Sequence, residues 1–383
     1  MRKPLFAIVV AAMILGLAEL TAFAFARTHA DLFAPDAQAL DEALDFQAYQ
    51  AFLADRYDER LGWRNPVSTT ATIEDCRGTP KHYSWNARGA RVTGATGPVE
   101  VIVVGDSFTH GHEASDSESY PYRLQQLTGL IVANHGVNAF DPLQATLQLE
   151  RVVPRYPEAH LAVMGIMYEN IRRVPNRYRG IYSPLAKEPF SFKPFIDVSR
   201  SDDAFRDNLN APPAQSPEAL RARIEAAIEQ DYWGRPQASF PYLASVAKVL
   251  GTRPVRSMVE RRIWGAAGMI EYQDPALLGG LRRIVERFIN SARRQNLRPV
   301  IAFIPQNGND LTSPDRLIDT LRADHPDALL LNVGQAAIDW DRYNLNGTVC
   351  HPSAYGYDQI ARHIASAIAL IPDRTMPPIA DRR

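Results

Sequence analysis

The chain has 383 residues, of which 46% are hydrophobic and 22% are charged. This composition is that of a globular protein and excludes disordered, collagen-like and disulfide-scaffold classes. Lys and Arg (42) balance Asp and Glu (43), so the net charge of -1 provides no global field for binding nucleic acid. The length suits one large domain with additions, or two domains. Two cysteines are too few for a cysteine-rich zinc site, and we expect neither a metal nor another cofactor.

The N-terminal sequence indicates the cellular compartment of the protein. Residues 4–26 form an apolar stretch that follows Arg2 and Lys3 and is interrupted only by Glu19. Such a stretch is either a secretory signal or a membrane anchor. Small residues at 22, 24 and 26 offer cleavage sites, whereas the 23 residues are also enough to span a bilayer. In both cases we expect the rest of the chain to be periplasmic or extracellular, and anchored in the inner membrane if residues 4–26 are retained.

Residues 27–98 are expected to form a membrane-proximal segment. Leu40, Leu44 and Phe52 belong to an apolar stripe with a spacing of four residues, which predicts one helix over 36–57. Residues 86–98 contain three glycines and are typical of loops and turns.

From residue 99 onward, short apolar runs alternate with segments of helical periodicity. The runs predict strands at 99–104, 130–133, 160–167, 299–304 and 328–333, and the periodic segments predict helices at 120–127, 141–153, 275–294, 315–323 and 354–371. This alternation predicts an α/β fold with a parallel, doubly wound sheet covered on both faces. A long insertion at about 175–274 interrupts the domain of 99–372, and residues 373–383 form a tail. Within the insertion, Ser216 is expected to cap a helix over 216–230.

Ser107 lies directly after the first predicted strand, in the sequence Gly105-Asp106-Ser107-Phe108. Ligands of a doubly wound sheet bind at the carboxyl ends of its strands, where a nucleophile would be useful. A serine at the start of a helix can also serve only as a cap. Position alone leaves both interpretations open.

The sequence resembles the SGNH, or GDSL-type, hydrolases in four blocks that occur in the order found in that family. The blocks are residues 105–108, 134–138, 168–170 and 351–357. The resemblance implies a three-layer, flavodoxin-like sandwich and a serine esterase that works through an acyl-enzyme. It further implies that Ser107 is the nucleophile and His351 the base. The backbone N–H groups of Ser107 and Gly136 and the side-chain amide of Asn170 would then bind the oxyanion.

The sequence departs from the family pattern in two places. The family's acid usually lies three residues before the histidine, but Thr348 occupies that position and cannot act as a carboxylate. We therefore predict a Ser107–His351 dyad, in which the Thr348 hydroxyl or a backbone carbonyl orients the imidazole, with Asp339 and Asp341 as alternatives. In the third block the usual glycine and aspartate around the asparagine are missing, so the assignment of Asn170 depends on the register.

Other polar residues lie close to these blocks in sequence. His110, His112 and His135 could bind zinc, but their loop-like spacing favours ordinary loop histidines. Arg172 and Arg173 follow Asn170, and with His110 they are candidate contacts for a substrate with carboxylate, phosphate or hydroxyl groups. Structural ion pairs explain such arginines equally well.

Three functions are compatible with these residues. The first is an extracytoplasmic esterase acting on an acylated small molecule or on O-acetyl groups of a cell-envelope glycan. The second is an O-acyltransferase to a glycan with the same Ser/His site. The family's acetylating proteins usually carry Asp-x-His upstream of the serine block, and its absence here favours hydrolysis. The third is a non-catalytic envelope-binding protein on a degenerate scaffold.

Cys76 and Cys350 are an even pair in a chain expected to reach an oxidising compartment, which predicts a disulfide beside His351. Two free thiols are the alternative.

Overall fold

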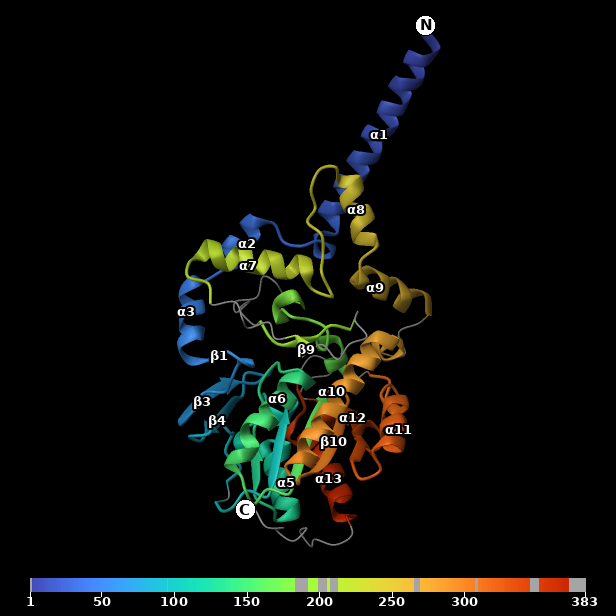
Figure 1. Cartoon of the computed structure of the whole chain (residues 1–383). Helices are drawn as coiled ribbons and strands as arrows, with labels where there is room; N and C mark the ends of the chain where they lie inside the picture. The colour runs from blue at the N-terminus through green and yellow to red at the C-terminus, as the bar shows by residue number, and fades with distance from the viewer. Residues whose placement is uncertain are drawn as a thin grey trace. The chain divides into compact units, whose positions relative to one another are not determined.

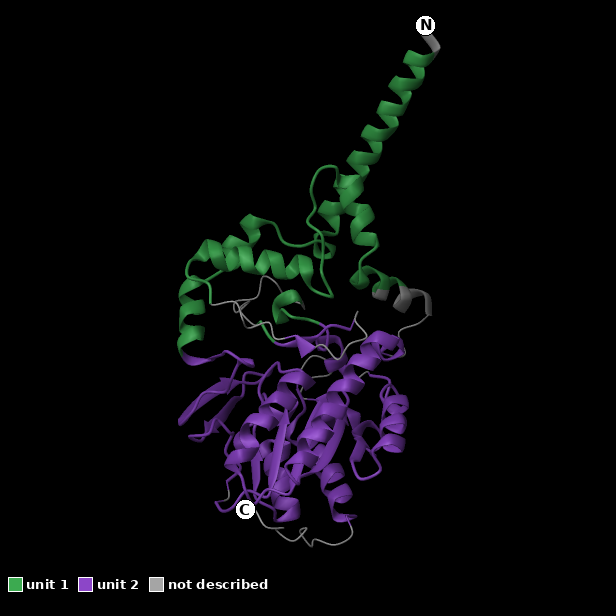
Figure 2. Ribbon diagram, in the orientation of Figure 1, with its two compact units in different colours: residues 1–54, 176–193, 208–266 green, residues 55–175, 194–207, 267–383 purple. Residues whose placement is uncertain are grey.

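The computed structural model describes residues 2–94, 96–182, 192–198, 205–206, 213–264, 269–306, 309–344 and 351–371. The chain divides into two compact units, coloured separately in Figure 2. The anchor unit contains residues 1–54, 176–193 and 208–266, and the sheet unit contains residues 55–175, 194–207 and 267–383. The sheet unit thus begins at residue 55, and the domain of 99–372 expected from the sequence stays a prediction.

The sheet unit is built on five parallel strands in the order β11-β10-β7-β5-β6. Their bounds are Val101–Gly105 (β5), Val132–Asn134 (β6), Leu161–Met167 (β7), Arg298–Ile304 (β10) and Leu329–Asn332 (β11). All residues of β5 and β7 are buried because helices cover both faces of a parallel sheet. The predicted α/β fold, with its parallel sheet in a three-layer sandwich, is confirmed.

Helices pack in pairs on the two faces of this sheet (Figure 1). Helices α5 (Tyr120–Thr128) and α13 (Ala354–Ala369) pack together in one layer, and α6 (Pro142–Val152) packs with α10 (Pro275–Arg294) in the other. Helix α11 (Asp315–Asp324) contacts β11. Asp141 starts α6 with a capping box, because its carboxylate accepts a hydrogen bond from the Gln144 N–H at 2.7 Å.

The single helix predicted over 36–57 is wrong. The structure has two helices, α2 (Ala37–Ala43) and α3 (Phe46–Asp55). The chain breaks at Leu44, whose backbone is extended, and the Asp45 carboxylate accepts a hydrogen bond from the Ala48 N–H at 3.0 Å. Aspartate offers the backbone a cap in place of a continued helix, and this local bond outweighs the apolar periodicity.

The structure also contains short strands and helices that the sequence analysis did not predict. In the sheet unit, β3 (Thr69–Glu74) and β4 (Pro80–Trp85) form an antiparallel hairpin. The remaining short elements are β1 (Tyr57–Asp58), β2 (Gly62–Trp63), α4 (Ser107–His110), β8 (Phe195–Ile196), β9 (Phe205–Arg206) and α12 (Trp340–Tyr343).

Most of the described regular structure in the anchor unit is helical. Its first helix, α1 (Arg2–Thr28), includes a stretch of 25 residues with a mean hydropathy of 2.3 that is long and apolar enough to cross a membrane. The insertion contributes α7 (Pro217–Gln230), α8 (Tyr242–Leu250) and α9 (Arg253–Trp264). Ser216 caps α7, as predicted, by accepting a hydrogen bond from the Ala219 N–H at 3.2 Å.

Candidate active site

Ser107 is the first residue of α4, directly after strand β5. The preceding residue, Asp106, caps this short helix, since its Oδ1 accepts a hydrogen bond from the Phe108 N–H at 2.9 Å. The capping role that was open for Ser107 is therefore filled by its neighbour. The Ser107 side chain remains available at the carboxyl edge of the sheet, where a doubly wound fold places its ligands.

The structure brings His351 to Ser107 across 244 positions in sequence. The His351 Nε2 and the Ser107 Oγ are 3.0 Å apart, which is within hydrogen-bond distance. His351 lies just before α13, and Ser353 caps that helix by accepting a hydrogen bond from the Gly356 N–H at 3.1 Å. A serine hydroxyl in contact with an imidazole is the pairing that nucleophilic catalysis requires.

A carboxylate occupies the other side of the imidazole. Glu113 Oε2 lies 3.0 Å from His351 Nδ1 and also accepts a hydrogen bond from the His351 backbone N–H at 2.9 Å. The predicted dyad without a carboxylate is therefore corrected to a line of three residues, Glu113–His351–Ser107. Thr348 lies outside the described residues, and in the structure the Nδ1 atom faces Glu113, not Asp339 or Asp341.

The charge on Glu113 matches this arrangement. The hydrogen bond with His351 is the largest influence on this carboxyl group and lowers its pKa to about 2, against the opposing effect of burial. Glu113 is therefore ionised at neutral pH. A negative charge at Nδ1 favours the tautomer with a proton on that nitrogen, and it would stabilise an imidazolium at His351.

Sequence reasoning missed Glu113 because it searched for the acid near the histidine. The acid lies instead six positions after the nucleophile, in the loop that follows α4. Its φ of 60° is left-handed, a conformation that a residue other than glycine adopts only at a cost of about 1–2 kcal/mol. A carboxylate directly after Gly111 and His112, in the same loop as the serine, was the available signal.

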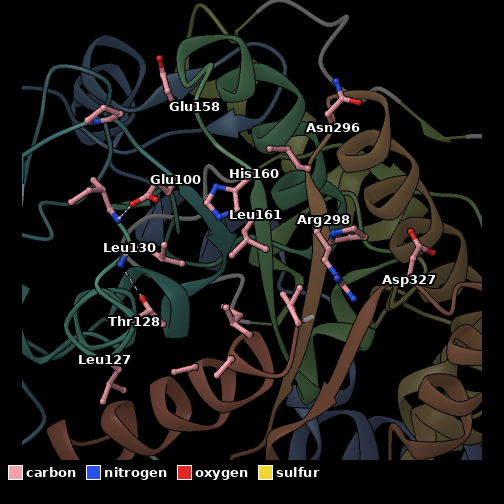
Figure 3. Close-up of a pocket in the computed structure, with 18 of the residues that line it drawn as sticks. Glu100, Leu127, Thr128, Leu130, Glu158, His160, Leu161, Asn296, Arg298 and Asp327 are labelled. Atoms are coloured by element: carbon pink, nitrogen blue, oxygen red, sulfur yellow. Dashed lines mark hydrogen bonds between the residues drawn. The ribbon is translucent and has the colours of Figure 1, made fainter. Parts of the chain in front are cut away.

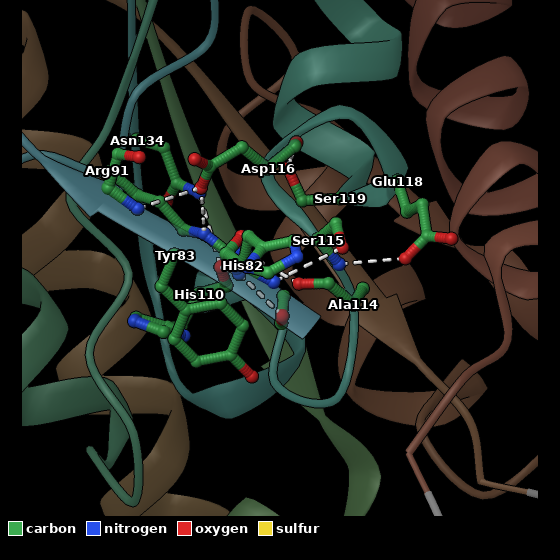
Figure 4. A network of polar contacts seen from close by, with 12 residues as sticks. His82, Tyr83, Arg91, His110, Ala114, Ser115, Asp116, Glu118, Ser119 and Asn134 are labelled. Atoms are coloured by element: carbon green, nitrogen blue, oxygen red, sulfur yellow. Dashed lines mark hydrogen bonds and ion pairs between the residues drawn. The ribbon is translucent and has the colours of Figure 1, made fainter. Parts of the chain in front are cut away.

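The loop that carries Glu113 is held by Arg91, which is 1% exposed. Figure 4 shows Arg91 among His110, Ala114 and Asp116. The Arg91 guanidinium donates hydrogen bonds to the backbone carbonyls of His110, Gly111 and Ala114 and, at 2.8 Å, to Asp116 Oδ1. The guanidinium also lies 4.0 Å from the ring centroid of Tyr83, whose hydroxyl accepts the Glu113 N–H at 2.7 Å. Arg91 is thus a positioning residue, because it fixes the backbone on both sides of the acid.

The predicted oxyanion donors lie in the same region, and two of them have partners within the chain. The Asn170 amide donates one N–H to Asp106 Oδ2 at 2.9 Å, which leaves its second N–H for a substrate oxygen. The Gly136 N–H donates to Asn134 Oδ1 at 3.0 Å. A side chain at Gly136 would collide with the His110 backbone N–H, which explains the glycine by close packing. The oxyanion roles of Ser107, Gly136 and Asn170 stay predictions.

The three candidate substrate contacts have structural partners. Burial lowers the pKa of His110 well below its usual value, and its ring packs near Tyr83 and Trp85. Arg172 pairs with Glu271 at 2.8 Å. Arg173, which is 4% exposed, lies 3.7 Å from Asp106 and 3.6 Å from Glu169. The ion-pair interpretation of the two arginines is therefore realised, and a substrate role for any of the three stays a prediction.

The other two histidines have separate surroundings. His112 meets the His351 ring edge to face at 4.6 Å between centroids, and burial lowers the pKa of His112 to about 4, so its ring is neutral at pH 7. His135 Nε2 lies 2.8 Å from the Tyr156 hydroxyl. Among the described residues there is no group of three or more side chains that could hold a metal ion.

Cys76 is disulfide-bonded. Cys350 itself lies outside the described residues, but it directly precedes His351. The bridge between Cys76 and Cys350 therefore stays a prediction; it would tie the loop after strand β3 to the segment that carries His351.

A cavity of about 990 Å³ lies at the opposite edge of the sheet (Figure 3). Its lining includes Glu100, His160 and Arg298, which stand at the amino ends of strands β5, β7 and β10. Since Ser107, Glu113 and His351 meet at the carboxyl edge of the sheet, this cavity is separate from the candidate active site.

No protein-family model matches the sequence, and curated proteins give no significant match. Three solved structures are similar to the chain in fold comparison. A protein from Desulfitobacterium hafniense, assigned to the G-D-S-L family of lipolytic proteins, shares 12% identity over 70% of this chain and 99% of its own, with a TM-score of 0.35.

A member of the same lipolytic family from Veillonella parvula shares 11% identity over 71% of this chain and 98% of its own, with a TM-score of 0.36. AlinE4, an SGNH-hydrolase family esterase, shares 14% identity over 72% of this chain and 97% of its own, with a TM-score of 0.32.

Proposed function

We propose that the protein is a serine esterase that cleaves an ester through an acyl-enzyme on Ser107. The observation that carries this proposal is the line of hydrogen-bond distances from Glu113 through His351 to Ser107, each 3.0 Å long. These three side chains supply a nucleophile, a base and a charge that stabilises the protonated base. A degenerate, non-catalytic scaffold is compatible with the sequence because the acid of the triad is missing from its usual place in the chain. Glu113 supplies a carboxylate beside His351, where such an acid would lie.

The chemistry proceeds in two steps. Ser107 Oγ attacks the ester carbonyl carbon and its proton passes to His351 Nε2. The tetrahedral intermediate then collapses, and the leaving alcohol takes that proton. In the second step His351 removes a proton from water, which attacks the acyl carbon. The carboxylic acid leaves and Ser107 regains its proton.

We further propose that the substrate is an O-acetyl group on a cell-envelope glycan outside the cytoplasm. Two observations support this location. Helix α1 has the length and apolar character of a signal or membrane anchor. The bonded Cys76 fits an oxidising compartment, where disulfides form and persist.

The test uses the full chain in nanodiscs with a fluorophosphonate probe, p-nitrophenyl acetate and an O-acetylated envelope glycan. We expect covalent labelling at Ser107 and release of acetate from both esters, and neither in Ser107→Ala. Absence of labelling and turnover in the wild type would contradict the esterase. Transfer of acetyl to an added sugar acceptor in place of water would instead show an O-acyltransferase.

A further inference from the structure

Glu19 is the one acidic residue of the apolar helix α1 and needs an explanation. A hydrocarbon layer of about 30 Å takes about 20 helical residues, which places the far boundary near Phe23 when counted from Pro4. Glu19 would then lie roughly 6 Å inside that boundary, at 1.5 Å per residue. A carboxylate at this depth is costly unless the protein supplies partners.

Helix α8 supplies these partners from the insertion. Glu19 Oε2 accepts a hydrogen bond from the Tyr242 N–H at 2.8 Å, and Oε1 accepts one from the Leu243 N–H at 3.3 Å. Both N–H groups belong to the first turn of α8, where no intrahelical acceptor exists and the helix dipole favours a negative charge. Glu19 therefore caps α8, although 223 positions separate it from Tyr242.

Helix α8 then follows α1 in the same direction, as Figure 1 shows. The rings of Phe23 and Tyr242 meet edge to face at 5.0 Å. Ala22 and Ala26 are each 5% exposed because their small side chains allow close packing, and Val249, near the end of α8, joins Ala26 in one apolar cluster. The start of α8 is thus fixed at the depth of Glu19.

The segment just before α8 and several residues of α8 itself expose apolar side chains. Phe240 is 76% exposed, Leu243 37% and Leu250 55%. Ala244 and Ala247 are exposed beside them, and Lys248 is the one charged residue of the helix. An exposed apolar surface continuous with a membrane-spanning helix fits lipid acyl chains better than water.

We propose that residues 240–243, which join the start of α8, are immersed in the membrane that α1 spans and form a second contact with the bilayer. Lys248 lies about 7 Å further along α8 than Leu243, at 1.5 Å per residue, and with Arg27 on α1 it stands at the level of the lipid headgroups. This inference rests on α1 being retained and is independent of the esterase activity.

The test is cysteine labelling of the full chain in nanodiscs with a charged, membrane-impermeant maleimide. The part of the chain that the structure describes has no free cysteine, so a single new thiol reports its own surroundings. The variants are Phe240→Cys and Leu243→Cys. Leu15→Cys, 60% exposed on α1, is the control for lipid, and Asp319→Cys, whose side chain is 73% exposed, is the control for water.

We expect labelling at 240 and 243 to be slow, as at 15, and at least about tenfold slower than at 319, because hydrocarbon suppresses the reactive thiolate. Labelling at 240 and 243 as fast as at 319 would overturn the proposal. So would a mature chain that begins after Ala24 or Ala26, which N-terminal sequencing of the same sample shows. Esterase activity measured in parallel tests the role of Ser107. Neither the labelling rates nor the N-terminal sequence changes the outcome of that test.

Discussion

The carboxyl edge of the sheet and the anchor unit are stabilised in different ways. At the sheet edge, the functional residues are placed by strands and short caps that are local in sequence, such as Asp106 between β5 and α4. In the anchor unit, contacts join segments far apart in the chain, such as Glu19 with α8 and Asp41 with Arg221. The comparison shows that local caps can position the residues of a site whose parts come from distant segments, whereas helix α8 of the anchor unit takes its cap from a residue far away in sequence.

The largest effect is expected at the nucleophile. Ser107→Ala should lower kcat for p-nitrophenyl acetate by at least about 10,000-fold, because the acyl-enzyme cannot form. The free energy of unfolding should change by no more than about 0.5 kcal/mol, since a different residue makes the local cap. Steady-state kinetics and thermal unfolding measure the two quantities. Activity close to the wild type would place the nucleophile elsewhere.

A disulfide between Cys76 and Cys350 would link two segments of the sheet unit that are far apart in sequence, as the long-range contacts do in the anchor unit. Cys76→Ser should reduce the free energy of unfolding by at most about 4–5 kcal/mol, as expected for a bridge that closes a long loop. Urea denaturation checks the value, and reduction of the wild type should reproduce it. Two alkylatable thiols in the unreduced wild type would refute the bridge itself.

Substitution of Arg91 tests how strongly the position of Glu113 depends on the hydrogen bonds that hold its loop. Arg91→Lys keeps the charge but cannot reach three carbonyls and Asp116 together, so we expect a loss of about 3 kcal/mol in stability and a lower kcat with KM little changed. Arg88→Lys, at an exposed arginine nearby, should stay within about 0.5 kcal/mol of the wild type. Equal kcat in Arg91→Lys and wild type would show that Glu113 keeps its place without this network.

The pH dependence of stability gives the smallest effect. The pKa of Glu113 falls from 4.5 to about 2 on folding, so its ionised form stabilises the native state above pH 4.5. That contribution is lost as pH falls toward 2. The stability difference between wild type and Glu113→Gln should therefore be constant above about pH 5 and shrink below pH 4.5. Glu74→Gln, at an exposed glutamate, is the matched control, and a difference that grows on acidification would contradict the hydrogen bond to His351.

Much of the sheet unit could be predicted from the sequence because buried parallel strands produce continuous apolar runs. The runs that end at Gly105 and Met167 identified β5 and β7 and the positions after them. Helix α8 could not be predicted in the same way, since its cap is a glutamate 223 positions away. The break between α2 and α3 was missed because one side-chain bond from Asp45 outweighs periodicity.

Within the site, Ser107 and His351 were predicted, and their distance agrees with the predicted roles. Glu113 was not predicted because its role depends on a left-handed backbone and on Arg91, which comes from a separate segment. The spacing between acid and histidine along the chain carries no information here. The contact between Glu113 and His351 depends on the folded backbone, which neither the spacing of residues along the chain nor the composition shows.

The most direct test of the account is kcat of Glu113→Gln beside Thr348→Ala, both measured with p-nitrophenyl acetate in the full chain. Glutamine keeps the shape of the side chain but removes the charge that supports the His351 imidazolium. We predict a fall of about 10,000-fold in Glu113→Gln, as for other triads that lose their carboxylate, and little change in Thr348→Ala. A Glu113→Gln variant with near wild-type kcat, together with a collapse in Thr348→Ala, would contradict the triad and restore the dyad that the sequence alone predicted.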